Sequence, residues 1–215
     1  MENMSSIAVV VITSGILSLL CLTILHFVST EFKASWRMVS EYALGKHPLL
    51  LTSFFIFWSI NNLLAAYLYL SIVSSAWAVF ASILVLISGI GAFMGGVFDI
   101  KHKLHGLSFA LGVPTFPIGA LLLAYHLSNQ NGWLAYQNVV LISAYSVWVS
   151  VVFMAVSMGL FFSGLKKAGV PFGPNQEPLQ SLPKGVVGIN GYANRLLVVA
   201  YIAFNSIVSL IYISR

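Results

Sequence analysis

The amino-acid sequence predicts an all-α polytopic membrane protein, a single domain over residues 1–215 built as a bundle of six transmembrane helices. Only 7% of the 215 residues are charged and 59% are hydrophobic. A soluble domain carries roughly 25% charged residues, so these charges are too few to cover a water-facing surface. Six separate stretches are also apolar over about the 20 residues that a spanning helix needs, and no period-two alternation indicates a β-barrel.

The six predicted helices follow one another along the whole chain. Their approximate bounds are Ile7–Val28, Leu49–Ile72, Trp77–Val97, Leu104–Leu127, Trp133–Phe162 and Leu196–Ile213. The first is preceded by MENMSS, which has no Lys or Arg, so we interpret it as a retained helix and not a signal peptide. The fifth is longer than a bilayer requires, which predicts that it tilts or extends past the membrane.

Charged residues gather on one side of this predicted bundle. An even number of spans places both termini on the same side, and of the 10 Lys and Arg only Arg215 lies there. The positive-inside rule then predicts that the three charged connections are cytoplasmic and both termini lie outside. The net charge of +5 does not indicate nucleic acid, because no basic stripe or stacking motif accompanies it. The expected partners are the lipid bilayer and a lipid-like ligand, while cofactor and oligomeric state stay unknown.

The stretch VFDIKHKLHG concentrates charge between the third and fourth predicted helices. His105 falls in the first turn of the fourth helix, where the helix dipole disfavours an imidazolium. With Asp99 to orient it, His105 is a candidate general base. His102 and His105 are weak candidates for metal ligands, because zinc needs at least three and Asp99 would not converge with them unaided. Haem ligation by His26 with His105 and a merely hydrated turn are the other interpretations.

Two more connections deliver polar groups to the same face. RMVSEYALG contains Ser40, Glu41 and Tyr42, and NGYANRLL contains Asn194 and Arg195. The predicted catalytic residues are therefore His105, Asp99 and Glu41. The predicted substrate-binding residues are Arg195, Ser40, Tyr42 and Asn194, with Arg195 holding an anionic head group.

Polar residues also occur inside the predicted spans. Asn61 and Asn62 lie near the middle of the second helix and Asn205 near the middle of the sixth. Polar groups in lipid need partners, so these amides are expected to pair between helices. The small residues from Ser88 to Gly96 recur every four positions, which favours close packing of the third helix against a neighbour.

Three hypotheses on function follow from these patterns. The first is an integral membrane protein whose polar cluster organises packing or binds a partner. The second is a membrane-embedded enzyme that acts on a lipid or isoprenoid. The third is a small-solute carrier with Asn61, Asn62 and Asn205 along its path, although no charged residue lies at mid-membrane.

The chain resembles an uncharacterised family of six-span membrane proteins, domain of unknown function 998. The resemblance rests on SEYALG, on GGVFDIKHKLHG followed by an apolar helix with Pro, and on NRLLVVAY. This chain has FDIK where the family pattern has a longer acidic turn containing Pro, and the charge pattern of relatives implies that the marked face lies outside the cytoplasm. The family name supplies no reaction. The polar marks that the resemblance implies here are Ser40, Glu41, Asp99, His105, Gly106 and Arg195.

Overall fold

A computed structural model describes residues 2–170 and 179–215, and within these residues it contains helices and no strands. Six of the helices are long and apolar enough to cross a membrane, which confirms the predicted fold class. The chain is accordingly a multi-pass integral membrane protein. The six helices are α1 (Glu2–Val28), α2 (Pro48–Ile72), α3 (Ala76–Val97), α4 (His105–Ser128), α5 (Gln137–Lys167) and α6 (Asn190–Ser214).

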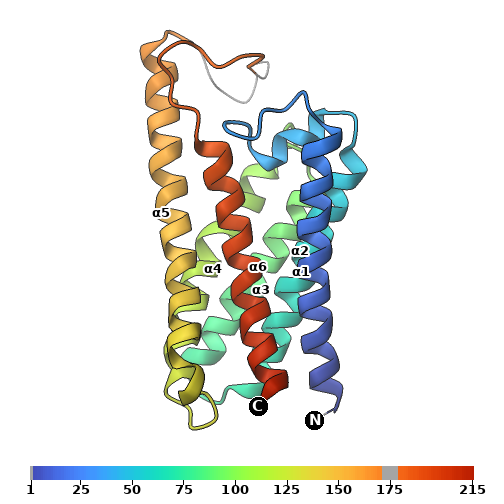
Figure 1. The fold of residues 1–215 in the computed structure, drawn as a ribbon, viewed down its shortest axis with the longest axis vertical. Coiled ribbons are helices and arrows are strands. Elements are labelled where there is room, and N and C mark those ends of the chain that lie inside the picture. The colour runs from blue at the N-terminus through green and yellow to red at the C-terminus, as the bar shows by residue number, and fades with distance from the viewer. Residues whose placement is uncertain (1, 171–178) are drawn as a thin grey trace.

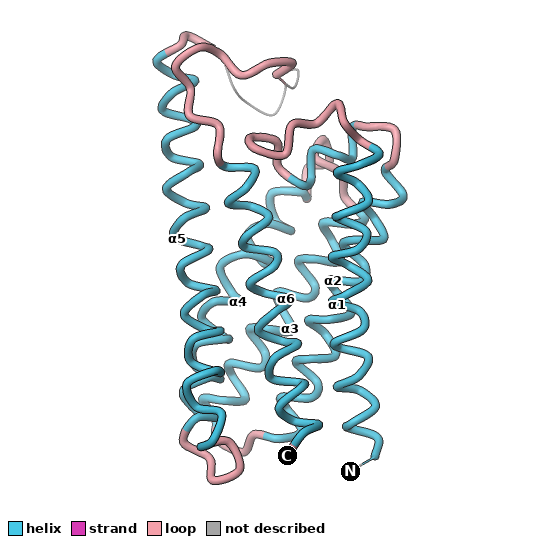
Figure 2. Tube along the Cα trace, in the orientation of Figure 1, coloured by secondary structure: helices cyan, strands magenta, loops and turns pink. Residues whose placement is uncertain are grey.

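The six helices run side by side along the long axis of the molecule (Figure 1). Both chain termini lie at one end, which we call the terminal end. The connections 29–47 and 98–104 and the described parts of the last connection, 168–170 and 179–189, lie at the opposite end, which we call the loop end (Figure 2). A 3-10 helix, η1 (Val39–Leu44), belongs to the loop end, and a shorter one, η2 (Leu134–Tyr136), to the terminal end. Which end faces the cytoplasm stays a prediction from the charge pattern.

The sixth helix starts earlier than the sequence predicts, at Asn190 instead of Leu196. The first backbone N–H groups of a helix have no partner within it. Here the N–H groups of Gly191 and Tyr192 both donate to the carbonyl oxygen of Ser35, at 2.9 and 3.2 Å. The first connection therefore supplies acceptors that extend α6 by more than a turn, and Arg195 lies within the helix.

Small residues on α3 let two neighbouring helices approach it closely. A Cβ atom added to Gly91 would lie 2.4 Å from the backbone nitrogen of Gly112 on α4. On the α2 side, a Cβ atom added to Gly96 would lie 2.9 Å from Cβ of Phe55. The small-residue pattern between Ser88 and Gly96 thus packs closely, as the spacing predicted, and it does so inside this bundle, where the sequence left packing against a second copy equally open.

A hydrogen bond and a ring stack join α4 to α6 in the interior. Pro117 has no N–H, so the carbonyl of Val113 lacks its usual helical donor. The Tyr201 hydroxyl donates to that carbonyl at 2.6 Å, and the Tyr201 ring stacks on Phe116 with centroids 4.2 Å apart. The two helices are therefore fixed to each other below the loop end, which sets the spacing of their loop-end halves.

Candidate functional site

Three buried asparagines form the centre of a polar network inside the bundle. The Asn205 amide nitrogen donates to the Asn61 and Asn62 side-chain oxygens at 2.9 and 2.8 Å. Its own oxygen accepts from the Tyr69 hydroxyl at 2.8 Å. All four side chains are fully buried. The predicted pairing of amides between helices is confirmed.

The network continues to the helices on both sides. Asn61 donates to the Val11 carbonyl of α1 at 2.8 Å, and Asn62 donates to the Ser88 hydroxyl of α3 at 3.4 Å. Ser88 in turn donates to the Gly112 carbonyl of α4 at 2.7 Å. Every amide group of the three asparagines is thus used within the protein, which supports a packing role. We call this set the amide network (Asn61, Asn62, Tyr69, Ser88 and Asn205).

A second polar set lies at the loop end and centres on Arg195. Its Nε donates to His26 Nε2 at 2.5 Å, and its terminal nitrogens donate to the Tyr42 hydroxyl at 3.0 Å and to the carbonyls of Arg37 and Gly191 at 2.8 Å each. The guanidinium also lies 5.6 Å from the centre of the Tyr42 ring. Arg195 therefore ties α1, the first connection and α6 together.

Glu41 belongs to the same set through Arg37. One Glu41 oxygen accepts from Arg37 at 2.6 Å, and the other accepts from the backbone N–H of Met38 at 2.6 Å. Arg37 also donates to the Leu179 carbonyl in the last connection. Both oxygens of Glu41 thus hold the loop in shape. We call the whole set the anchor layer (His26, Arg37, Glu41, Tyr42 and Arg195).

Two asparagines of α6 attach the first connection to that helix. The Asn194 side-chain oxygen accepts from the Val39 backbone N–H at 2.9 Å. Asn190 donates from its amide nitrogen to the Trp36 carbonyl at 2.8 Å. These bonds hold η1 over the space between the loop-end halves of α2, α4 and α6.

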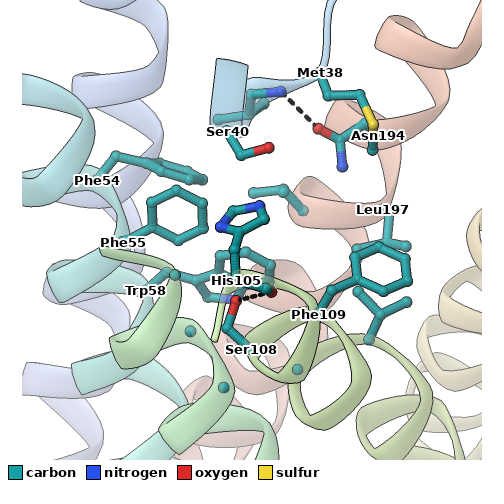
Figure 3. Close-up of a pocket in the computed structure, with 17 residues that line it drawn as sticks. Met38, Ser40, Phe54, Phe55, Trp58, His105, Ser108, Phe109, Asn194 and Leu197 are labelled. Atoms are coloured by element: carbon teal, nitrogen blue, oxygen red, sulfur yellow. Dashed lines mark hydrogen bonds between the residues drawn. The ribbon is translucent and has the colours of Figure 1, made fainter. Parts of the chain in front are cut away.

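Beneath η1 lies a pocket of about 70 Å³, which far exceeds the ~15 Å³ that one water needs. Most of its wall is aromatic, aliphatic or glycine surface, and its polar members are Ser40, His105, Ser108, Asn194 and Trp58. Figure 3 shows Ser40 above and His105 below, facing the same space. We call it the rim pocket; its apolar lining comprises Met38, Val39, Phe54, Phe55, Gly91, Ala92, Gly95, Phe109, Gly112, Val113, Leu197 and Val198.

His105 is held in the pocket wall by a backbone group. Its Nδ1 lies 3.0 Å from the carbonyl oxygen of Phe98, which only accepts hydrogen bonds, so Nδ1 carries the hydrogen. In the neutral ring, Nε2 is then an acceptor. The backbone carbonyl of Phe98 thus performs the orienting role that the sequence assigned to Asp99.

Four polar groups on this wall make no hydrogen bond with any part of the chain that the structure describes. The indole N–H of Trp58 is the most deeply placed, because Trp58 is only 6% exposed. The others are the Ser40 hydroxyl, the second ring nitrogen of His105 and the amide nitrogen of Asn194. Of the four, only the Trp58 N–H is fully buried, and buried polar groups are nearly always paired. Ser40, His105 and Asn194 are half-buried, so their free groups face space that water or a ligand can occupy.

Asp99 and His102 lie apart from both sets. The Asp99 side chain is exposed and accepts from the Lys101 backbone N–H at 2.9 Å. His102 is exposed and stacks on Phe98 with ring centroids 4.4 Å apart. Within residues 2–170 and 179–215, no three His, Cys, Asp or Glu side chains lie close enough to hold a metal ion.

The structure therefore divides the predicted cluster into three places. Glu41, Tyr42 and Arg195 meet in the anchor layer, while Ser40 and His105 line the rim pocket. Asn194 also lines the rim pocket, and its side-chain oxygen holds η1 through the Val39 N–H. Asp99 stands outside. His26, considered above as a haem ligand, has Nδ1 2.5 Å from the Leu22 carbonyl and Nε2 bonded to Arg195, so both its ring nitrogens are engaged.

Trp58 is the pocket residue that sequence reasoning missed. Trp58 belongs to the apolar run of the second helix. The neighbouring residues in the sequence do not indicate whether its ring faces lipid, packs against another helix or lines a pocket. Only the unpaired N–H in the folded structure distinguishes it.

Comparison with protein-family models, with curated proteins and with solved structures found no match to this chain. The resemblance to domain of unknown function 998 therefore stays a prediction.

Proposed function

We propose that the protein binds an amphipathic, lipid-like molecule in the rim pocket. One observation supports this above all others: four polar groups without partners among the described residues share a wall that is mostly apolar. An apolar cavity with a few convergent polar groups is typical of a small-molecule site. A molecule with a polar head and a hydrocarbon chain matches both parts of that wall.

The position of the pocket agrees with a ligand that comes from the membrane. Trp58 lies ten residues after Pro48 in α2, hence roughly 15 Å along the helix axis at 1.5 Å per residue. The pocket thus extends from the loop end into the depth of the bundle. Phe109 lines the pocket and is 46% exposed, so the wall at α4 reaches the outer, lipid-facing surface.

The anchor layer has a structural role in this proposal. Arg195 was predicted to hold an anionic head group, yet its guanidinium is bonded to His26, Tyr42 and two backbone carbonyls. Glu41 was predicted to be catalytic, yet both its oxygens shape the loop. These residues hold η1 in place, and η1 in turn forms the roof of the pocket.

Thermal unfolding of the purified protein in mild detergent tests the proposal. We expect a total membrane-lipid extract to raise the unfolding midpoint of the wild type, because a ligand that binds the folded state stabilises it by mass action. The variant His105→Phe should lose most of this rise. His102→Phe is the matched control, since His102 lies outside the pocket in the same segment. An equal rise in both variants would contradict the proposal.

A second candidate function is catalysis on the bound lipid. It is favoured by one observation: His105 is oriented by the Phe98 carbonyl, with Nε2 free and on the same pocket as the Ser40 hydroxyl. A neutral, oriented imidazole is a competent general base. Mass spectrometry of lipids incubated with the wild type and with His105→Ala tests it. A lipid product formed by the wild type and not by His105→Ala supports catalysis. If the wild type binds the lipid but leaves it chemically unchanged, catalysis is contradicted.

A further inference from the structure

We infer that the head group in the rim pocket is uncharged and carries both a hydroxyl and a carbonyl, as in a monoacylglycerol. This inference rests on the proposed lipid binding and adds the chemistry of the head group. It follows from three properties of the wall: its charge, its fixed donors and its fixed acceptor.

Among the residues that the structure describes, the wall offers no paired charge to neutralise an ionised head group. Of the described lining residues, His105 alone has a titratable side chain. The nearest arginine of α6, Arg195, donates to four acceptors in the anchor layer. Burying an unpaired charge in an apolar pocket is costly, so a phosphate, carboxylate or ammonium head is disfavoured. The bound head is therefore uncharged.

Two groups on the wall act only as donors. The indole nitrogen of Trp58 carries a hydrogen and has no acceptor capacity. The Asn194 oxygen accepts from the Val39 N–H, which fixes the amide orientation and leaves the NH₂ as the unpaired half. Both donors need an acceptor on the ligand. An ester carbonyl oxygen, with two lone pairs, serves this purpose.

One group acts only as an acceptor. Because His105 Nδ1 donates to the Phe98 carbonyl, Nε2 of the neutral ring presents a lone pair. It needs a donor on the ligand, and a hydroxyl supplies one. The Ser40 hydroxyl both donates and accepts, so it fits beside either group. In a monoacylglycerol the ester carbonyl and a hydroxyl are only a few bonds apart. Its single hydrocarbon chain would extend along the apolar part of the wall.

Four single-chain probes test the inference on the wild type alone. Monoolein has both groups, methyl oleate lacks the hydroxyl, oleyl alcohol lacks the carbonyl, and oleate at alkaline pH is an anion. One hydrogen bond contributes about 1 kcal/mol, which is roughly five- to tenfold in affinity. Dissociation constants in detergent should therefore be about five- to tenfold lower for monoolein than for methyl oleate or oleyl alcohol, and weakest binding is expected for oleate.

Two variants assign the contacts. Trp58→Phe should weaken monoolein and methyl oleate about fivefold and leave oleyl alcohol unchanged, because it removes a donor to the carbonyl. His105→Phe should remove the preference for monoolein over methyl oleate. The ligand-free unfolding midpoint of each variant verifies that it folds.

The outcomes separate the inference from the proposed function. Equal affinity for monoolein and methyl oleate, or tighter binding of oleate, overturns the inference and leaves the lipid-binding pocket intact. Absence of binding by all four probes and by a total lipid extract overturns both. The predicted ranking, with its loss in the two variants, supports both.

Discussion

The amide network and the rim pocket lie about one helical turn apart, yet they use their polar groups in opposite ways. Asn61 of the network follows Trp58 of the pocket by three residues on α2, and Ser88 precedes Gly91 by three on α3. In the network every amide group has a partner. In the pocket four polar groups have none among the described residues. The contrast separates polar residues that are paired inside the bundle from polar residues that line a cavity without a partner among the described residues.

The energetics agree with this difference. Leaving a buried donor or acceptor unpaired costs about 1–3 kcal/mol. The amide network avoids that cost by closing on itself. In the rim pocket this cost falls on the indole N–H of Trp58, a residue that is only 6% exposed. A ligand that supplies an acceptor would remove the cost. Variants of the two regions should therefore respond differently in stability and in binding.

The largest expected effect belongs to the centre of the network. Asn205→Leu removes three hydrogen bonds and leaves the oxygens of Asn61 and Asn62 and the Tyr69 hydroxyl without their partner. We expect the free energy of unfolding to fall by about 2–4 kcal/mol. Thermal unfolding in detergent measures it, with the exposed Asn129→Leu as control. A loss no larger than that of the control would remove the distinction between the two regions.

The next effect is expected at the anchor layer, which holds the roof of the pocket. Arg195→Leu removes four donated hydrogen bonds and should lower the free energy of unfolding by about 2–3 kcal/mol. It should also speed tryptic cleavage at the exposed Lys33 and Lys46, since η1 loses its attachment to α6. Limited proteolysis measures the cleavage rate at these two lysines, with the variant Lys103→Leu as the control. Unchanged cleavage would mean that Arg195 does not fix the loop.

A smaller effect is expected where the two regions meet. Gly91→Ala would place a Cβ atom 2.4 Å from the Gly112 nitrogen and push α3 from α4, which disturbs the Ser88 bond to the Gly112 carbonyl. Overpacking of this kind costs about 1–3 kcal/mol. In Gly159→Ala, by contrast, the added Cβ meets nothing within 4 Å. Comparing the unfolding midpoints of the two variants measures the cost; equal midpoints would contradict the close α3–α4 contact.

The smallest effect on stability is expected in the pocket itself. Trp58→Phe removes the cost of an N–H that has no partner among the described residues, but it also replaces a buried ring by a smaller one, which costs packing; the two effects oppose each other, so the ligand-free unfolding free energy should change by less than about 1 kcal/mol. Lipid-induced stabilisation should fall in the same variant. A large loss of ligand-free stability, of the size expected for Asn205→Leu, would mean that Trp58 acts in packing as the network does.

The sequence predicted the fold well because the bilayer constrains it so strongly. Apolar runs of spanning length specify the six helices, and the absence of water in lipid makes pairing of Asn61, Asn62 and Asn205 necessary. The sequence did not predict which polar residues of the loop end belong to the anchor layer and which belong to the rim pocket. This division depends on how the first connection docks onto α6, where Ser35 and Asn194 set the helix start and the loop position.

Individual residues of the site show the same limit. Glu41, Asp99 and His105 are equally polar in sequence, but only His105 enters the pocket, because the tight turn before α4 directs its Nδ1 to the Phe98 carbonyl. Trp58 belongs to an apolar run and gives no signal at all. Hydrogen-bond pairing across the chain is a property of the folded structure, and it alone separates the two regions.

Native mass spectrometry of the protein extracted directly from membranes tests the central claim, that unused polar groups of the rim pocket receive a lipid. We predict one uncharged, hydroxyl-bearing lipid retained by the wild type and by His102→Phe, and lost from His105→Phe. Equal retention by both histidine variants, or exclusive retention of charged lipids, would contradict the account.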